Sequence, residues 1–198
     1  MPPDERRRSQ SGARFQRYLA SGIAVVVSLI SLGVALSANR TQERLLAASV
    51  WPSLEFGTGN RDDDGRDVIR LEVGNNGVGP ARLRGVQVLY KGQLAHNAYD
   101  VLKQCCGLGD NPANTVTSGT RGRVLKAGDT ITLFMLYREV NDRDVWERFN
   151  HERFAVGVRA CYCSVLDDCW MFDSTREDAD PDPVASCPRL AETDEWSG

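Results

Sequence analysis

The sequence predicts a mainly β protein: an antiparallel β-sandwich with two short helices, preceded by one N-terminal transmembrane helix. Three observations lead to this prediction. An uncharged apolar run fills residues 18–39, apolar residues alternate with period two in segments between residues 52 and 172, and glycine-rich turns separate these segments. Such alternation marks strands with one buried face. Six or seven short strands in about 125 residues suit a sandwich of immunoglobulin-like architecture.

The apolar run predicts a transmembrane helix over residues 18–39. As an α-helix it would be about 33 Å long, enough to cross a hydrocarbon core of about 30 Å. Five arginines precede the run and give residues 1–17 a net charge of +3, whereas the rest of the chain carries −6. The positive-inside rule therefore predicts a cytoplasmic stub at residues 1–17 and export of everything after Arg40. We expect a single-pass protein of the bacterial inner membrane with a periplasmic C-terminal domain.

A cleavable signal peptide is the competing interpretation of this run, since Ala35-Leu36-Ser37 could serve as a cleavage site. The run is longer than the usual apolar region of about 7–15 residues, and helix-forming sequence continues beyond it. We therefore expect an uncleaved anchor, followed by a helical stalk over residues 40–50 that Pro52 ends.

Small residues along the predicted helix would permit a homodimer through the membrane segment. They recur at spacings of three or four and so share one stripe of the helix: Ala20, Ala24, Ser28, Ser31 and Ala35. The alternative is that alanine and serine are simply common in such helices.

The exported domain is expected at residues 51–174. Its predicted strands lie around residues 52–56, 68–73, 86–90, 131–137, 154–162 and 169–172. Turn sequences separate several of them: Asp64-Gly65, Asn75–Pro80, Lys91-Gly92 and Ala127–Asp129.

Two short helices and a tail complete the predicted domain. The helices are expected at residues 97–103 and 141–150, the second with Asn141 as its N-cap. The tail at residues 175–198 is rich in Asp, Glu, Pro and Ser, so we expect it to be acidic, mostly disordered and pinned at Cys187.

The order of these segments resembles a set of uncharacterised bacterial proteins that have one membrane anchor and an exported immunoglobulin-like β-sandwich. The resemblance rests on Val50-Trp51-Pro52, on the segment Leu71–Ala81 (LEVGNNGVGPA) and on Cys161–Val165 (CYCSV). These are strand and turn signatures. The resemblance implies the anchored topology and the sandwich but no activity.

Six cysteines follow the membrane segment, and none precedes it. In an exported domain an even number predicts disulfides, with 15 possible connectivities among six cysteines. The disulfide candidates are Cys105, Cys106, Cys161, Cys163, Cys169 and Cys187.

A thiol-based metal or redox site is the alternative use of these cysteines. Cys161 and Cys163 are two apart in a predicted strand, so both thiols share the face opposite to Val158 and Tyr162. Cys169 follows a short turn and should lie nearby. Thiolates of these three could bind a soft ion such as Cu(I) or Zn(II), although the spacing matches no standard zinc module. A Cys105–Cys106 bond would be the redox candidate.

Other chemistry finds little support. The segment Asn60–Gly65 is similar to the start of a calcium loop, but position twelve would be Leu71 where a glutamate is required, so a hairpin tip is expected. Hydrolase and phosphate-binding motifs are missing from the sequence, and His151-Glu152 suggests a surface pair. The acidic balance argues against nucleic-acid binding. Nothing in the sequence indicates a cofactor.

The sequence thus predicts a membrane-tethered, exported binding or scaffolding module without evident catalysis. Its expected partners are the lipid bilayer, through residues 18–39, and another envelope protein. The alternative is a thiol-based metal-binding or redox-sensing protein of the cell envelope.

Overall fold

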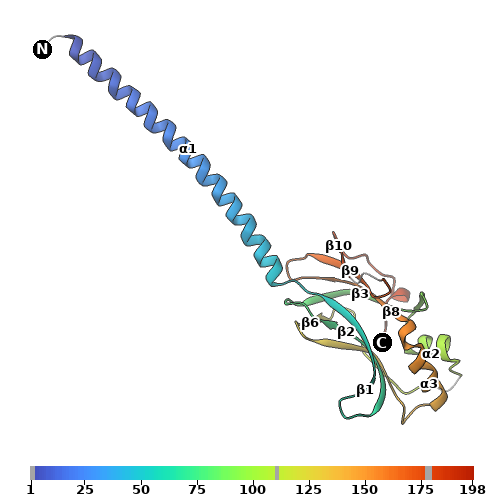
Figure 1. Cartoon of the computed structure of the whole chain (residues 1–198). Helices are drawn as coiled ribbons and strands as arrows, with labels where there is room; N and C mark the ends of the chain where they lie inside the picture. Colours follow the sequence, from blue (N-terminus) through green and yellow to red (C-terminus); the bar gives the residue numbers. More distant parts are fainter. Residues whose placement is uncertain (1–2, 110–111, 177–179) are drawn as a thin grey trace. The chain divides into compact units, whose positions relative to one another are not determined.

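The structure is a computed structural model that describes residues 3–109, 112–176 and 180–198 (Figure 1). The chain divides into two compact units, residues 1–48 and residues 49–198. The first is part of one long helix, and the second holds every described strand and two further α-helices. The predicted mainly β class with one N-terminal apolar helix is therefore confirmed.

Helix α1 (Pro3–Ser49) contains a stretch, Ala24–Ser49, that is long and apolar enough to cross a membrane. This stretch overlaps the predicted span at residues 24–39 and continues through residues 40–49 of the predicted stalk. Its hydroxyl groups are compatible with lipid, because Ser28 and Ser31 donate to carbonyl oxygens one turn earlier, each at 2.8 Å.

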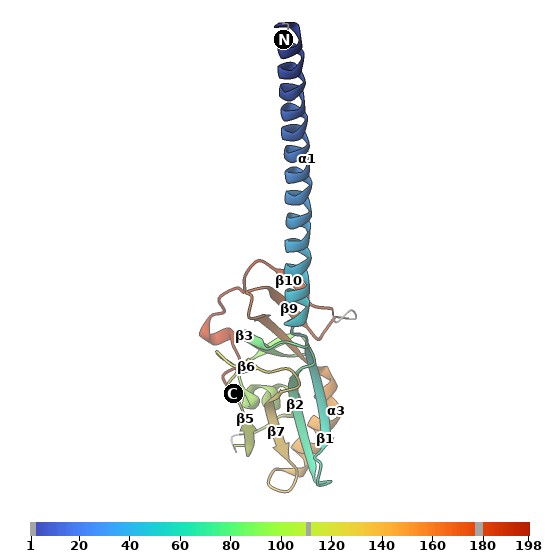
Figure 2. The ribbon, with the colours of Figure 1, turned by 90° about the vertical axis from the view of Figure 1, so that its left-hand side faces the viewer.

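The second unit contains two antiparallel sheets. The first has the strand order β1 (Leu54–Arg61), β2 (Asp67–Asn75), β7 (Thr130–Tyr137) and β5 (Thr115–Thr117), which Figure 2 shows side by side. The second has the order β10 (Asp182–Val184), β9 (Cys169–Asp173), β8 (Val156–Cys163), β3 (Ala81–Tyr90) and β4 (Gln93–Ala95). Strand β6 (Val124–Leu125) pairs with the start of β3.

The six predicted strands correspond to β1, β2, β3, β7, β8 and β9. Two predicted starts are wrong: Pro52 precedes β1, which begins at Leu54, and Phe154 lies in a 3-10 helix (η1, Arg153–Ala155) before β8, with its side chain 72% exposed. The sequence did not reveal β4, β5, β6 and β10, because segments of two or three residues are too short to show a period.

Helix α2 (Ala98–Cys106) begins where Asn97 accepts a hydrogen bond from the backbone of Asp100 at 3.0 Å. It ends at Gly107, which adopts the left-handed conformation (φ 62°) that glycine tolerates.

Helix α3 (Arg143–Glu152) was expected to be capped by Asn141, but the cap is Asp142. The Asp142 carboxylate accepts from the Val145 N–H at 3.0 Å. The Asn141 side chain instead exchanges hydrogen bonds with the backbone of Asn114, 27 residues earlier. This long-range pairing is what sequence reading missed.

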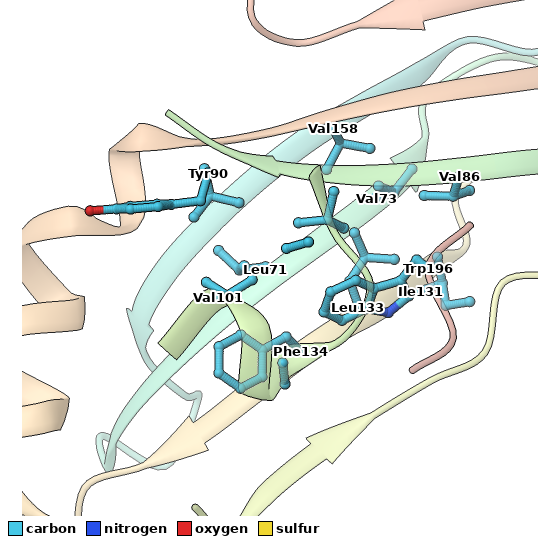
Figure 3. Packing of buried hydrophobic residues seen from close by; sticks show 14 of the residues in the cluster. Leu71, Val73, Val86, Tyr90, Val101, Ile131, Leu133, Phe134, Val158 and Trp196 are labelled. Atoms are coloured by element: carbon cyan, nitrogen blue, oxygen red, sulfur yellow. The ribbon is translucent and has the colours of Figure 1, made fainter. Parts of the chain in front are cut away.

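One hydrophobic core joins the two sheets and the two short helices (Figure 3). Leu71 and Leu133 come from the first sheet and Val86 and Val158 from the second, and all are almost fully buried. Each such side chain contributes about 1.5–3 kcal/mol on burial. Helix α3 adds Phe149, whose ring lies 5.3 Å from that of Phe134.

A buried amide, that of Asn75 at the end of β2, links the glycine-rich turn to the entry of β1 and to β6. Its Oδ1 accepts from the N–H of Ser53, at 3.1 Å. Its Nδ2 donates to the carbonyls of Gly79 (2.8 Å) and Leu125 (3.1 Å). The side chain therefore fastens the entry of β1, the 75–80 turn and β6 to one another.

Two glycines of this turn are required by close approach of the preceding chain. A Cβ on Gly79 would lie 2.0 Å from the carbonyl oxygen of Val50, and one on Gly77 would lie 2.4 Å from the Ser53 nitrogen. Such contacts cannot form, so the motif Asn75–Pro80 encodes the packing of the turn against residues 50–53.

The sequence predicts a mostly disordered tail, and the structure corrects this for residues 180–198. Trp196 is 2% exposed and belongs to the core, and its backbone N–H donates to the Val86 carbonyl at 2.8 Å. Leu190 lies against Gly85, where a Cβ would approach its Cδ1 to 2.7 Å. The acidic composition of the tail indicated disorder, so the sequence did not predict that Leu190 and Trp196 pack against the domain. Residues 1–2 of the predicted stub and 177–179 of the tail lie outside the described residues.

Replacing Asn75 by alanine is expected to lower the free energy of unfolding of the 49–198 unit by about 3 kcal/mol. The substitution leaves buried carbonyl and N–H groups without partners, which costs about 1–3 kcal/mol for each group. Denaturant titration of the purified protein measures the change. Asn76→Ala is the matched control, because Asn76 is exposed and its side-chain amide donates to the exposed Glu55 carboxylate. Equal effects of the two substitutions would contradict the assigned role.

Candidate functional site

Strand β8 positions the two cysteines that the sequence singled out. Cys161 and Cys163 share one face of β8, whereas Ala160 and Tyr162 on the other face join the core. The predicted placement of both thiols outside the main core is therefore correct. Both are nevertheless buried, at 4% and 3% exposure.

Disulfides account for the burial of this face. Cys163 and Cys169 are register partners at the end of β8 and the start of β9. A disulfide joins them beside the turn of this hairpin, with a Cα–Cα distance of 4.0 Å. Cys161 is bonded to Cys187 of the tail, with a Cα–Cα distance of 5.6 Å. The tail is thus bonded covalently to β8 through Cys187, the residue at which the sequence predicted its attachment.

The third disulfide joins Cys105 to Cys106 at the end of α2, with a Cα–Cα distance of 3.7 Å. Cys106 is buried in the core, and Cys105 packs against it. All six cysteines are therefore bonded, in one of the 15 pairings that the sequence left open.

The two disulfides on β8 are in contact with each other. The Sγ atoms of Cys163 and Cys187, which belong to different disulfides, are 3.7 Å apart. The sulfurs of Cys163, Cys169 and Cys187 all lie within 4.8 Å of one another. The structure thus brings Cys187, in place of Cys161, into the group with Cys163 and Cys169.

A cavity of about 430 Å³ opens onto this sulfur group. It is lined by Arg84, Cys163, Asp167, Cys169, Ala185, Ser186, Cys187, Pro188 and Arg189. Asp167 forms an ion pair with Arg82, outside the lining. The side chains of Arg84 and Arg189 therefore give the cavity lining a net positive charge. Cations beside a cysteine sulfur favour its thiolate form.

Tyr162 lies between Cys161 and Cys163 in β8, on the face that joins the core. Burial raises the pKa of Tyr162 to about 12, so its hydroxyl stays protonated. The ring stacks on Trp170 of β9 with centroids 5.8 Å apart. Tyr162 and Trp170 form the apolar backing of the disulfide-bearing hairpin.

The acidic loop that is similar to a calcium loop is the hairpin tip between β1 and β2. Asp62 accepts from the backbone N–H groups of Asp64 (3.1 Å) and Arg66 (2.9 Å) and from the Arg66 guanidinium (2.7 Å). Desolvation raises the pKa of Asp62, but the hydrogen bonds from Arg66 more than offset this and hold it below its ordinary value. The Asp62 carboxylate closes the hairpin, as expected for a structural turn.

Glu152 of the expected His151-Glu152 surface pair also binds two residues at the end of β3. Glu152 accepts from the Tyr90 hydroxyl at 2.7 Å and pairs with Lys91 at 2.9 Å. The hydrogen bonds from Lys91 and Tyr90 lower the pKa of Glu152, so it is ionised at neutral pH. This group ties α3 to the end of β3.

Sequence reasoning missed a grouping of Ser197, His96 and Asp100. The Ser197 hydroxyl donates to the His96 carbonyl at 3.1 Å, and the His96 N–H donates to the Asp100 carboxylate at 3.0 Å. Both bonds go to the His96 backbone, whereas nucleophilic catalysis requires them at the imidazole. The grouping therefore holds the tail end in place. Ser197 lies 101 residues from His96, and no local signal links them.

Comparison of the chain with family models, with curated proteins and with solved structures finds no match.

Mass spectrometry of the unreduced, alkylated protein is expected to find no alkylated cysteine and two cross-linked products, Cys161–Cys187 and Cys163–Cys169. The geometry of β8 and β9 favours this pairing because Cys163 and Cys169 are direct register partners. Reduction before alkylation, which should label all six cysteines, is the control. Full alkylation without reduction would overturn the disulfide assignment.

Proposed function

We propose that the chain is a single-pass membrane protein whose exported domain binds another envelope protein. An apolar helix with arginines on its N-terminal side supports a cytoplasmic N-terminus. Three disulfides in the second unit suit an oxidising compartment, and for a bacterial protein this is the periplasmic side of the inner membrane. The resemblance to anchored bacterial proteins points the same way. The small-residue stripe of α1 is proposed as a homodimer contact within the bilayer.

We further propose that the exported domain is an immunoglobulin-like sandwich. The strand order β1-β2-β7-β5 follows the pattern A-B-E-D of such domains, and β9-β8-β3-β4 follows G-F-C with one added strand. Domains of this kind host many functions, so the architecture supports a binding role only together with a suitable surface.

The free edge of β1 is the observation that carries the binding proposal. Among the described residues β1 pairs with β2 alone, so no strand lies along the other side of this eight-residue strand. The strand contains neither lysine nor proline, the residues that usually protect such an edge. Its bulge lies near Asn60, at the far end, which leaves residues 54–58 regular. An extended segment of a partner could pair with this edge by strand addition.

Gly57 offers a precise test of this edge. It is exposed, and no atom lies within 4 Å of a Cβ added there, so substitution leaves the fold undisturbed. A photo-crosslinking residue at position 57 of the full chain in native membranes is expected to give a discrete adduct with an envelope protein. The same residue at Gly109, which is equally open, is the matched control.

In a chain without the crosslinking residue, Gly57→Lys should abolish copurification of the protein identified in the adduct, because a charged side chain obstructs pairing along the edge. Gly109→Lys should leave it unchanged. Identical adducts at both positions, or none at position 57, would exclude β1 as the docking edge.

A thiol-based metal site is the second candidate, and the clustering of Cys163, Cys169 and Cys187 within 4.8 Å favours it. Three thiolates at such separations suit a soft ion such as Cu(I), provided that both disulfides are first reduced. Elemental analysis after anaerobic reduction and incubation with Cu(I) tests it: one retained ion per chain, lost in Cys187→Ser, would support the site. Retention of no ion by the reduced protein would eliminate it.

A further inference from the structure

We propose that the four cysteines on and beside β8 form a thiol–disulfide exchange centre, in which Cys163 can take Cys187 from Cys161. The proposal goes beyond partner binding and does not depend on it. It rests on two disulfides that touch, on a cavity that reaches three of their four sulfurs, and on the charges that line this cavity.

The contact between the two disulfides supplies the geometry for exchange. Exchange requires a thiolate to reach one sulfur of a neighbouring disulfide. The Cys163 and Cys187 sulfurs are 3.7 Å apart, already at van der Waals separation. The bond that would form therefore needs only a small displacement of two side chains.

The cavity decides where an external reductant enters. Cys163, Cys169 and Cys187 line it, whereas Cys161 does not. Cys169 is 8% exposed and Cys163 only 3%, so Cys169 is the more accessible end of its disulfide. Arg84 and Arg189 line the same cavity and favour the thiolate that would appear at Cys163.

The reaction balances with a dithiol as the reductant. One thiolate of the dithiol bonds to the Cys169 sulfur, and the Cys163–Cys169 bond breaks with its electron pair on Cys163. The Cys163 thiolate then attacks the Cys187 sulfur, the Cys161–Cys187 bond breaks, and the Cys161 thiolate takes a proton. The second thiol of the dithiol displaces Cys169 as a thiol and leaves as a cyclic disulfide. The protein gains two electrons and two protons and keeps one bond, Cys163–Cys187.

The exchange would move the attachment point of the tail. Cys161 and Cys163 are two residues apart on one strand, a distance of about 6.6 Å along β8. The tail would stay covalently bound but would be anchored nearer to the β8–β9 turn. Leu190, three residues beyond Cys187, would then be drawn away from its contact with Gly85.

Limited reduction of the full chain tests the proposal. Dithiothreitol in substoichiometric amount at pH 8, followed by acid quenching, alkylation and mass spectrometry, is expected to give a species with Cys163 bonded to Cys187. Cys161 and Cys169 should carry the alkyl groups. If partly reduced chains instead keep Cys161–Cys187 with Cys163 and Cys169 alkylated, the proposal is overturned.

A matched pair of variants removes the dependence on a reductant. Cys169→Ser leaves a free thiol at Cys163, so the Cys163–Cys187 bond is expected to appear at pH 8 without added dithiol, with alkylated Cys161. Cys161→Ser leaves a free thiol at Cys187 and keeps the Cys163–Cys169 disulfide. The Cys187 thiolate should then attack the Cys163 sulfur and displace Cys169, which yields Cys163–Cys187 with alkylated Cys169. Unchanged native pairing in both variants would refute the exchange. The wild-type measurement decides the matter if either variant fails to fold.

Discussion

The Asn75 amide is the interaction on which the arrangement of the second unit depends. Its side chain hydrogen-bonds to backbone groups of three segments: the entry to β1, the 75–80 turn and the end of β6. A buried polar group is expensive unless it is fully hydrogen-bonded, and this one is. Because β6 belongs to the second sheet and β1 to the first, the amide adds a polar link between the two sheets at one end of the core.

The glycines beside Asn75 follow from the same constraint. Gly77 and Gly79 let the chain before β1 pass within contact distance of the turn, and any side chain there would force it outward. The amide and the glycines therefore act as a unit, since the hydrogen bonds form only at this close approach. Tail packing elsewhere repeats the pattern, with Gly85 making room for Leu190 on the face of β3.

Much of this structure is readable in the sequence, and the limits have a physical cause. Alternation over residues such as Ile69, Leu71 and Val73 reveals the long strands, because burial of one face imposes period two. The shared face of Cys161 and Cys163 follows from the same geometry. The partner of Cys161 does not, because Cys187 lies in a polar segment without periodicity, 26 residues away.

Other features depend on contacts that no local pattern encodes. Trp196 enters the core from a segment whose composition indicates disorder, and its position is fixed by a hydrogen bond to Val86, far away in the chain. The displacement of Asn141 by Asp142 as the cap of α3 similarly reflects a long-range bond to Asn114. The free edge of β1 could be recognised only once the strand order was known.

The Cys161–Cys187 bond also determines how the molecule responds to proteolysis. A protease that cuts at the exposed residues Ala185 and Ser186 would not release the C-terminal peptide, because the disulfide holds it to β8. The product would gain the mass of one water and migrate as an intact chain until a reductant is added. In an oxidising compartment, cleavage at this point would therefore leave the C-terminal peptide attached to the domain. The peptide would be lost only where thiols are abundant enough to reduce the disulfide.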